Sequence, residues 1–134
     1  MGNVSIKQEI VEEKPKILAI DDDPMILMLL ADMLSPDYCL QLAKCAADAE
    51  KLITQNPPNL ILLDIQMPGI SGFQLLQNLK KSSEYNRIPV IIVSGHIEIE
   101  FIILAEQNGA SSVVAKPINK DELLEKIKIA LTGA

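Results

Sequence analysis

The chain has 134 residues, which is enough for one domain that buries a core without disulfides or metals to hold it together. Hydrophobic residues make up 49% and charged residues 22%, which excludes a disordered chain, and with only 3% aromatic residues the core must be aliphatic. The formal net charge of −6 argues against direct binding to nucleic acid, which needs a basic surface.

The sequence predicts a cytoplasmic protein. No apolar run approaches the roughly 18 residues that a membrane-spanning helix needs, and the first residues show no basic-then-apolar secretory pattern. Residues 1–14 are polar and are expected to form an N-terminal extension to a domain over 15–134. Cys39 and Cys45 lack metal-ligand spacing and are interpreted as free, buried thiols in a reducing compartment.

Short apolar runs of strand length alternate along the chain with longer stretches of helical spacing. Strands are predicted at Lys16–Ile20, Cys39–Ala43, Leu60–Leu63, Pro89–Val93 and Ser112–Ala115. Helices are predicted at Pro24–Leu34, Ala47–Gln55, Gly72–Lys81, Glu98–Asn108 and Lys120–Leu131. Asp23 is expected to cap the first helix before Pro24, and Asn108-Gly109 to end the fourth.

This alternation predicts an α/β fold, a single doubly wound (βα)5 domain with a parallel sheet covered by helices on both faces. The strands are nearly continuous apolar runs rather than alternating ones, which is typical of strands buried on both sides.

Polar residues follow four of the predicted strands. They are the triplet Asp21-Asp22-Asp23, then Asp64, Ser94 and Lys116. Ligands of open α/β sheets bind outside the carboxyl ends of the strands, so these side chains are expected to share one pocket. Two like charges about 4 Å apart repel by roughly 4 kcal/mol at an effective dielectric constant near 20, so the aspartate triplet calls for a cation.

Oxygen ligands with open positions suit Mg²⁺, and Mn²⁺ has similar preferences. A nucleophilic Asp beside such an ion can accept a phosphoryl group when a lysine and a hydroxyl share the negative charge. Asp23 is left out of the metal site, because its position before Pro24 suits helix capping.

The motifs AIDDDP, LILLDIQMPGISG, VIIVSGH and GASSVVAKPI occur in this order. Together they resemble the receiver domain of two-component response regulators, over about Lys16 to Leu131. The resemblance implies a flavodoxin-like fold with the strand order 2-1-3-4-5. It also implies a phosphorylation-switched signalling domain, with self-phosphorylation and self-dephosphorylation chemistry, rather than an enzyme with a separate substrate.

The resemblance implies a role for each site residue. Asp64 would accept the phosphoryl group of a sensor histidine kinase or histidine phosphotransfer protein. Asp22 would ligate Mg²⁺ directly and Asp21 mainly through water, with Asp64 and the backbone carbonyl of Gln66 completing the protein ligands.

Two further site residues follow from the same resemblance. Lys116 would pair with the phosphoryl oxygens, and Ser94 would donate a hydrogen bond to one of them. The Lys116-Pro117 bond would be cis, and the loop from Met67 to Gly72 would lead into the third helix.

The chain departs from the family pattern at Val113, where an aromatic switch residue normally stands. Output by a ring that flips inward behind Ser94 is therefore excluded, although movement of Ser94 itself is still available to the switch. Gln66 follows Asp64 by two positions, and His96 follows Ser94 by two. We hypothesise that these two residues gate the water that hydrolyses the acyl phosphate. For His96, an exposed loop position is the simpler interpretation.

The fourth predicted helix carries more apolar residues than one buried stripe needs. Phe101, Leu104 and Ala105 are expected to face the sheet, and Ile99, Ile102 or Ile103 to stay near the surface with Ile129 of the fifth helix. The face made by the fourth helix, fifth strand and fifth helix is thus a candidate surface for a downstream protein target or a homodimer.

Two other classes of function compete with a receiver. A haloacid dehalogenase-type phosphatase also uses an Asp nucleophile and Mg²⁺, but it needs a second Asp where Gln66 stands. An interaction module that kept the fold and lost the chemistry is opposed by the presence of every reacting residue. A stand-alone regulator is favoured slightly over a piece of a hybrid kinase by the initial Met1.

Overall fold

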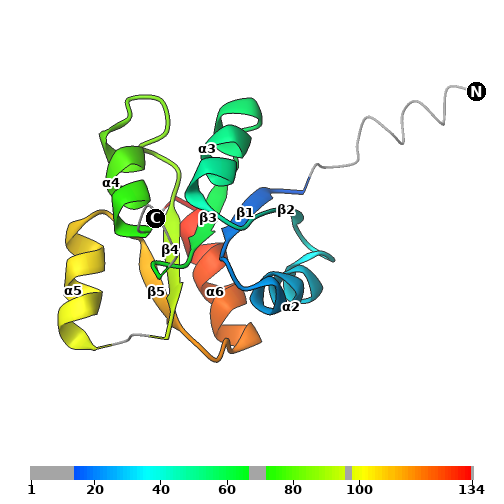
Figure 1. Ribbon diagram of the computed structural model, residues 1–134. Helices are drawn as coiled ribbons and strands as arrows, with labels where there is room; N and C mark the ends of the chain where they lie inside the picture. The colour runs from blue at the N-terminus through cyan, green and yellow to red at the C-terminus, as the bar shows by residue number, and fades with distance from the viewer. Residues whose placement is uncertain (1–13, 67–71, 96–97, 134) are drawn as a thin grey trace, which may run out of the picture.

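The computed structural model describes residues 14–66, 72–95 and 98–133. These residues form five strands and five helices in strict alternation (Figure 1). The strands are β1 (Lys16–Ile20), β2 (Cys39–Ala43), β3 (Leu60–Leu63), β4 (Val90–Ser94) and β5 (Ser112–Ala115). They pair in parallel in the order β2-β1-β3-β4-β5, which confirms the predicted topology.

The helices are α2 (Pro24–Leu34), α3 (Ala46–Gln55), α4 (Gly72–Lys81), α5 (Ile99–Gln107) and α6 (Lys120–Leu131). Every predicted helix is present; α3 differs from its predicted bounds by one residue at one end, and β4 and α5 differ by one residue at both ends. Asp23 caps α2 as predicted, because its Oδ1 accepts a hydrogen bond of 2.9 Å from the backbone N–H of Met25. The left-handed Gly109 (φ 98°) ends α5.

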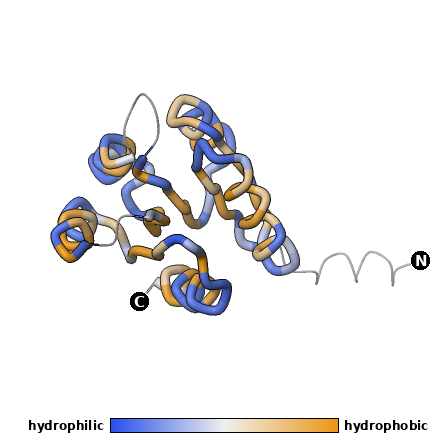
Figure 2. Tube along the Cα trace, turned by 60° about the horizontal axis from the view of Figure 1, so that its bottom comes forward, coloured by the Kyte–Doolittle hydropathy of each residue, from blue (hydrophilic) through white to orange (hydrophobic). Residues whose placement is uncertain are grey.

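The helices divide into two layers, with α2 and α6 on one face of the sheet and α3, α4 and α5 on the other (Figure 1). Side chains alternate along a strand, so each strand supplies both layers: Leu18 and Ile20 of β1 meet one, Ile17 and Ala19 the other. Figure 2 shows hydrophobic stretches along the central strands and helices of mixed hydropathy around them. Among the described residues no helix is both apolar enough and long enough to span a bilayer.

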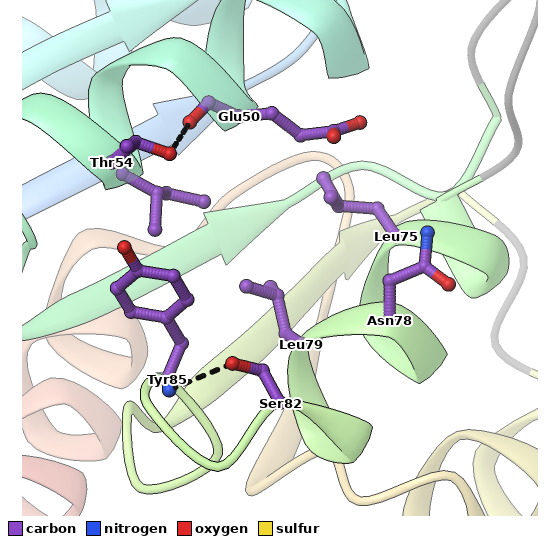
Figure 3. Close-up of a pocket in the computed structure, with 8 residues that line it drawn as sticks. Glu50, Thr54, Leu75, Asn78, Leu79, Ser82 and Tyr85 are labelled. Carbon is purple, nitrogen blue, oxygen red and sulfur yellow. Dashed lines mark hydrogen bonds between the residues drawn. The ribbon is translucent and has the colours of Figure 1, made fainter.

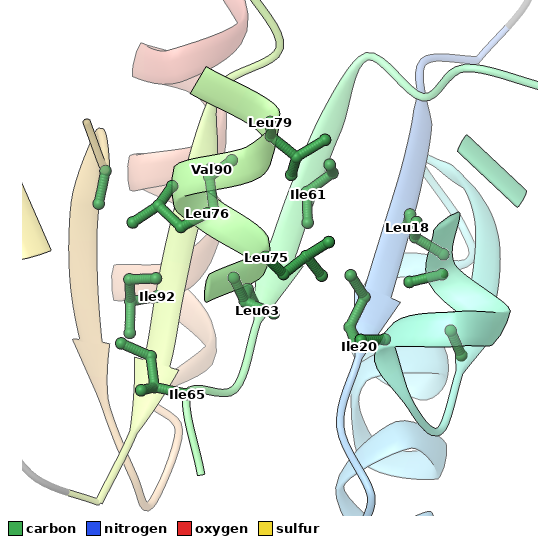
Figure 4. Packing of buried hydrophobic residues seen from close by; sticks show 14 of the residues in the cluster. Leu18, Ile20, Ile61, Leu63, Ile65, Leu75, Leu76, Leu79, Val90 and Ile92 are labelled. Atoms are coloured by element: carbon green, nitrogen blue, oxygen red, sulfur yellow. The ribbon is translucent and has the colours of Figure 1, made fainter. Parts of the chain in front are cut away.

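Helix α4 anchors one layer with three leucines. Leu75, Leu76 and Leu79 point from α4 onto the buried side chains of β3 and β4, as Figure 4 shows. Complete burial of a leucine side chain contributes roughly 1.5–3 kcal/mol, so this stripe fixes α4 firmly on the sheet.

Three predictions about burial were wrong. The edge strand β2, which pairs only with β1, is incompletely covered: Cys39 and Leu42 are exposed, and Ala43 is its buried residue. This position leaves Cys39 exposed, and Cys45 is only partly buried. On α5, Leu104 is 46% exposed instead of facing the sheet, and Ala105 is the buried residue of that helix.

Gly72 opens α4 in direct contact with the end of β3. Its N–H donates a hydrogen bond of 3.0 Å to the carbonyl oxygen of Ile65. A Cβ at this position would lie 2.4 Å from the Cα of Ile65 and 2.6 Å from the carbonyl oxygen of Asp64. Only glycine therefore allows the helix to begin this close to the strand.

Replacing Gly72 with Ala should lower the free energy of unfolding by about 1–3 kcal/mol, because the new methyl group meets backbone atoms that cannot rotate away. Urea unfolding would measure the loss. Gly95→Ala is the matched control, since no described atom lies within 4 Å of the added Cβ. Equal stability of the two variants would contradict the close contact.

Candidate functional site

The ends of β1 and β3 bring two aspartates side by side. Ile20 pairs with Leu63 in the parallel register, and each is followed by an Asp. The backbone N–H of Asp64 donates a hydrogen bond of 2.9 Å to the carbonyl oxygen of Ile20, next to Asp21. The sheet register therefore forces two side chains of like charge together.

Three carboxylates form an acidic cluster at this edge. Asp21, Asp22 and Asp64 each offer an oxygen, and these oxygens all lie within 4.8 Å of one another. Asp21 and Asp64 are buried, whereas Asp22 is exposed. The cluster is thus closed on the protein side and open to solvent at Asp22.

Lys116 supplies the compensating charge from the end of β5. Its Nζ lies 2.9 Å from Asp21 Oδ2 and 3.9 Å from Asp64 Oδ2. The Lys116-Pro117 bond is cis, as the resemblance implied. The backbone N–H of Lys116 donates to the carbonyl oxygen of Ser94 at 2.9 Å, which ties the lysine to the end of β4. Ser94 is fully buried there.

Burial raises the pKa of Asp64 from 3.8 to about 6. The neighbouring carboxylates of Asp21 and Asp22 act in the same direction. The Gln66 amide, which donates to Asp64 Oδ1 at 3.2 Å, and the Lys116 ammonium lower the pKa but do not offset burial. Asp64 is therefore ionised at neutral pH at a cost that a nearby cation would remove.

The remaining predicted residues fall around this cluster. Gln66 is exposed beside Asp64. The backbone N–H of Asp23 donates a hydrogen bond of 2.9 Å to Asp21 Oδ1 and so orients that carboxylate. His96 and the loop residues Met67 to Ser71 lie outside the described residues. The close pairing of Lys116 with Asp21 was not predicted, because the resemblance assigned the lysine only to phosphoryl oxygens.

The donor set fits a hard divalent cation. Three carboxylates within reach of one point are the oxygen ligands that Mg²⁺ and Mn²⁺ prefer, and the solvent side of Asp22 leaves room for water ligands. All three groups that the described residues offer here are carboxylates, whereas zinc sites are typically built with nitrogen or sulfur ligands.

A separate cavity of about 230 Å³ lies between α3 and α4 (Figure 3). Ile53, Leu75 and Leu79 line it with apolar side chains, and the ring of Tyr85 lies at one side (Figure 3). No member of the acidic cluster lines it, so the chemistry of the strand ends is independent of this cavity.

Comparison with known proteins matches residues 17–128 to the response regulator receiver domain. The protein PilH of Pseudomonas aeruginosa is 34% identical over 88% of this chain and 98% of its own length. The crystal structure of the receiver domain of NtrX from Brucella abortus is 33% identical, covers 88% of this chain and 99% of that one, and superposes with a TM-score of 0.81.

The chain belongs to the response regulator receiver domain family. This membership confirms the resemblance and removes the phosphatase interpretation. Several relatives are longer than a receiver domain: the chain spans 48% of KdpE from Staphylococcus aureus and 8% of the hybrid signal transduction histidine kinase D of Dictyostelium discoideum. The receiver fold is therefore used both nearly alone and as part of larger proteins.

Asp64→Asn should stabilise this receiver domain in the absence of divalent ions. The folded pKa of Asp64 (about 6) exceeds the reference value of 3.8, so the folded state binds the proton more tightly than the unfolded state. Ionisation of Asp64 therefore costs the folded state free energy. This penalty is absent below about pH 4, grows as the pH rises to about 6, and stays constant at neutral pH. At 1.36 kcal/mol per pKa unit the full penalty is roughly 3 kcal/mol.

Thermal unfolding in EDTA at pH 4 and pH 7.5 would measure this difference. The gain from Asp64→Asn should appear at pH 7.5 and shrink towards zero at pH 4. Asp32→Asn, at an exposed position of α2, is the control and should show no such pH dependence. A gain of equal size at both pH values would contradict the electrostatic explanation.

Proposed function

We propose that Asp64 is the phosphoacceptor of this receiver domain and that its phosphorylation changes the affinity of the domain for a protein partner. The observation that carries the proposal is a buried aspartate held among two other carboxylates and a lysine at the ends of parallel strands. Such a carboxylate is ionised at neutral pH and lies beside the exposed Asp22. The Lys116 ammonium next to it can pair with the oxygens of an added phosphoryl group.

In the proposed reaction an oxygen of Asp64 attacks the phosphorus of a phosphohistidine. The new O–P bond forms as the N–P bond breaks, and the electron pair stays on the donor imidazole, which takes up a proton. Lys116 then shifts from Asp21 towards the phosphoryl oxygens, which lie close because its Nζ is already 3.9 Å from Asp64 Oδ2. The hydroxyl of Ser94, at the end of the neighbouring strand, donates a hydrogen bond to the same group.

The acidic cluster is proposed to hold Mg²⁺ or Mn²⁺. Asp22 and Asp64 would be direct ligands, Asp21 would act mainly through water, and the backbone carbonyl of Gln66 would complete the protein ligands. When bound, the ion neutralises the charge that gathers on the phosphoryl oxygens. The same carboxylates repel one another without a cation, so this chain is expected to bind the ion even before it is phosphorylated.

Incubation with acetyl phosphate and Mg²⁺ should add one phosphate group, about 80 Da, to the intact mass of the chain. The gain should be absent for Asp64→Ala and when EDTA removes the ion. Asp32→Ala, on the exposed surface of α2, is the matched control and should still gain the mass. A gain that survives Asp64→Ala would contradict the assignment, and no gain under any condition would favour an interaction module without the chemistry.

The proposed phosphodonor is a sensor histidine kinase or histidine phosphotransfer protein, and it needs a surface beside the acidic cluster. Helix α2 starts directly after Asp23 and exposes Met25, Met28 and Leu29 to solvent, with Met28 66% exposed. Methionine side chains adapt to different partner surfaces. We place the donor contact on this face of α2.

Met28→Asp should slow phosphotransfer from a phosphorylated histidine donor about tenfold, because it puts a charge into an apolar contact. It should leave the reaction with acetyl phosphate unchanged, since a small donor needs no protein surface. Ile103→Asp is the matched control, because this exposed apolar side chain lies on α5, in the helix layer on the opposite face of the sheet from α2. Equal loss with both donors would show that the site itself was damaged.

The proposed output surface lies at the β5 edge of the sheet, opposite the β2 edge. On α5, Ile99 is 74% exposed, and Ile103 and Leu104 are about half exposed. Ile129 of α6 adds a further apolar side chain. This surface is suited to a downstream protein target or a second copy of the chain, because apolar groups in this number favour association over solvation.

A further inference from the structure

The geometry points to the contact between α4 and α5, headed by the ring pair Phe73–Phe101, as the positioning element that makes α5 respond to the state of Asp64. We define this contact, the α4–α5 seam, by Phe73, Gln77 and Lys80 on α4 and by Phe101, Asn108 and Gly109 at α5. The inference rests on the proposed function, because it takes Asp64 as the phosphoacceptor and α5 as part of the output surface.

The first step is the absence of an aromatic side chain on β5. Val113 is aliphatic and partly buried against the same apolar cluster as Phe73 and Phe101. Tyr38 packs on the opposite face of the sheet, and Tyr85 lines the cavity between α3 and α4. The chain has two tyrosines, two phenylalanines and no tryptophan, and of these four rings the phenylalanines are the pair that joins α4 to α5.

The second step is the link between Asp64 and Phe73. Gly72 donates a hydrogen bond to Ile65 and leaves no room for a Cβ against the backbone of Asp64 and Ile65. Phe73 is the next residue of the chain. A displacement of the backbone at Asp64 would therefore move the first turn of α4, because the two backbones are already in close contact there.

The third step is the ring pair itself. The centroids of Phe73 and Phe101 lie 5.6 Å apart with an angle of 60° between the ring planes. This tilted arrangement is the favourable geometry for aromatic pairs. Both rings are partly buried, so a shift of α4 at Phe73 changes the surroundings of Phe101 on α5.

The seam continues along one side of α4. Phe73, Gln77 and Lys80 have the i, i+4, i+7 spacing of one helix face. Gln77 Nε2 donates a hydrogen bond of 3.0 Å to Asn108 Oδ1 at the end of α5. The stem of Lys80 lies against Gly109, where a Cβ would approach its Cγ to 2.8 Å.

The last step is the weak attachment of α5 elsewhere. Ala105 is the buried residue of α5, and a buried methyl group gives little orientation to a helix. Ile99, Ile103 and Leu104 face solvent. Few side chains of α5 are therefore available to orient this helix and its exposed apolar surface, and Phe101, which pairs with Phe73 of α4, is one of them.

The chain contains two phenylalanines, so labelling with 4-fluorophenylalanine gives two fluorine resonances, both from the seam. Variants Phe73→Leu and Phe101→Leu assign them. Beryllium fluoride with Mg²⁺, a non-covalent mimic of the phosphoryl group, adds its own bound fluorine signal in the same spectrum. We expect both phenylalanine resonances to shift when that bound signal appears, and neither to shift in Asp64→Ala.

This experiment separates the two ideas. A bound fluoride signal with unmoved phenylalanine resonances would overturn the inference and leave the proposed function standing. A missing fluoride signal, together with no mass gain from acetyl phosphate, would count against the proposed function itself.

Hydrogen exchange of the α5 amides tests whether the ring pair carries the effect. Phosphorylation should change their exchange rates in the wild-type chain by about twofold to tenfold, the range that the coupling energy of an aromatic pair allows. Phe101→Leu should bring this ratio close to one while the mass gain from acetyl phosphate persists. Ile103→Ala, an exposed change on the same helix, should keep the wild-type ratio. A wild-type ratio in Phe101→Leu would overturn the inference.

Discussion

The repulsion between carboxylates at the ends of β1 and β3 is the constraint on which the site depends. The parallel register places Asp21 and Asp64 together, and burial prevents water from screening them. The Lys116 ammonium compensates the negative charge of Asp21 strongly, at 2.9 Å, and that of Asp64 weakly, at 3.9 Å. This imbalance leaves Asp64 as the less compensated anion, with its pKa raised to about 6 by burial.

A site of this kind can be maintained only on a rigid scaffold. Separating the two strand ends would lower the repulsion, and the backbone hydrogen bond from Asp64 to Ile20 opposes it. The leucines of α4 add to this restraint, because they pack over β3 and β4 (Figure 4). The energy of the aliphatic core therefore holds the charged cluster in an arrangement that its own electrostatics disfavour.

The fold could be predicted because its signals are local. Apolar runs, the Asp23–Pro24 helix start and Gly109 each act over a few residues, and the alternation of elements then leaves few topologies. The exposure of Cys39 was missed although the resemblance implied that β2 lies at the sheet edge, because the apolar residues of β2 resemble those of a strand covered on both faces. The Lys116–Asp21 pair and the Phe73–Phe101 pair join distant parts of the chain, so no local sequence pattern predicts either contact.

The arrangement of α4 explains how a local charge can matter at a distance. One side of the helix packs on the sheet through leucines, its first residue touches the backbone next to Asp64, and a third set of residues meets α5. Because the helix is rigid between these contacts, it cannot respond at one without moving at another. The sparse burial of α5 makes that helix the element that yields, since few core contacts oppose its displacement. Because Val113 is not aromatic, the packing of α4 is the physical route by which we propose that the acidic cluster is connected to the apolar surface of α5.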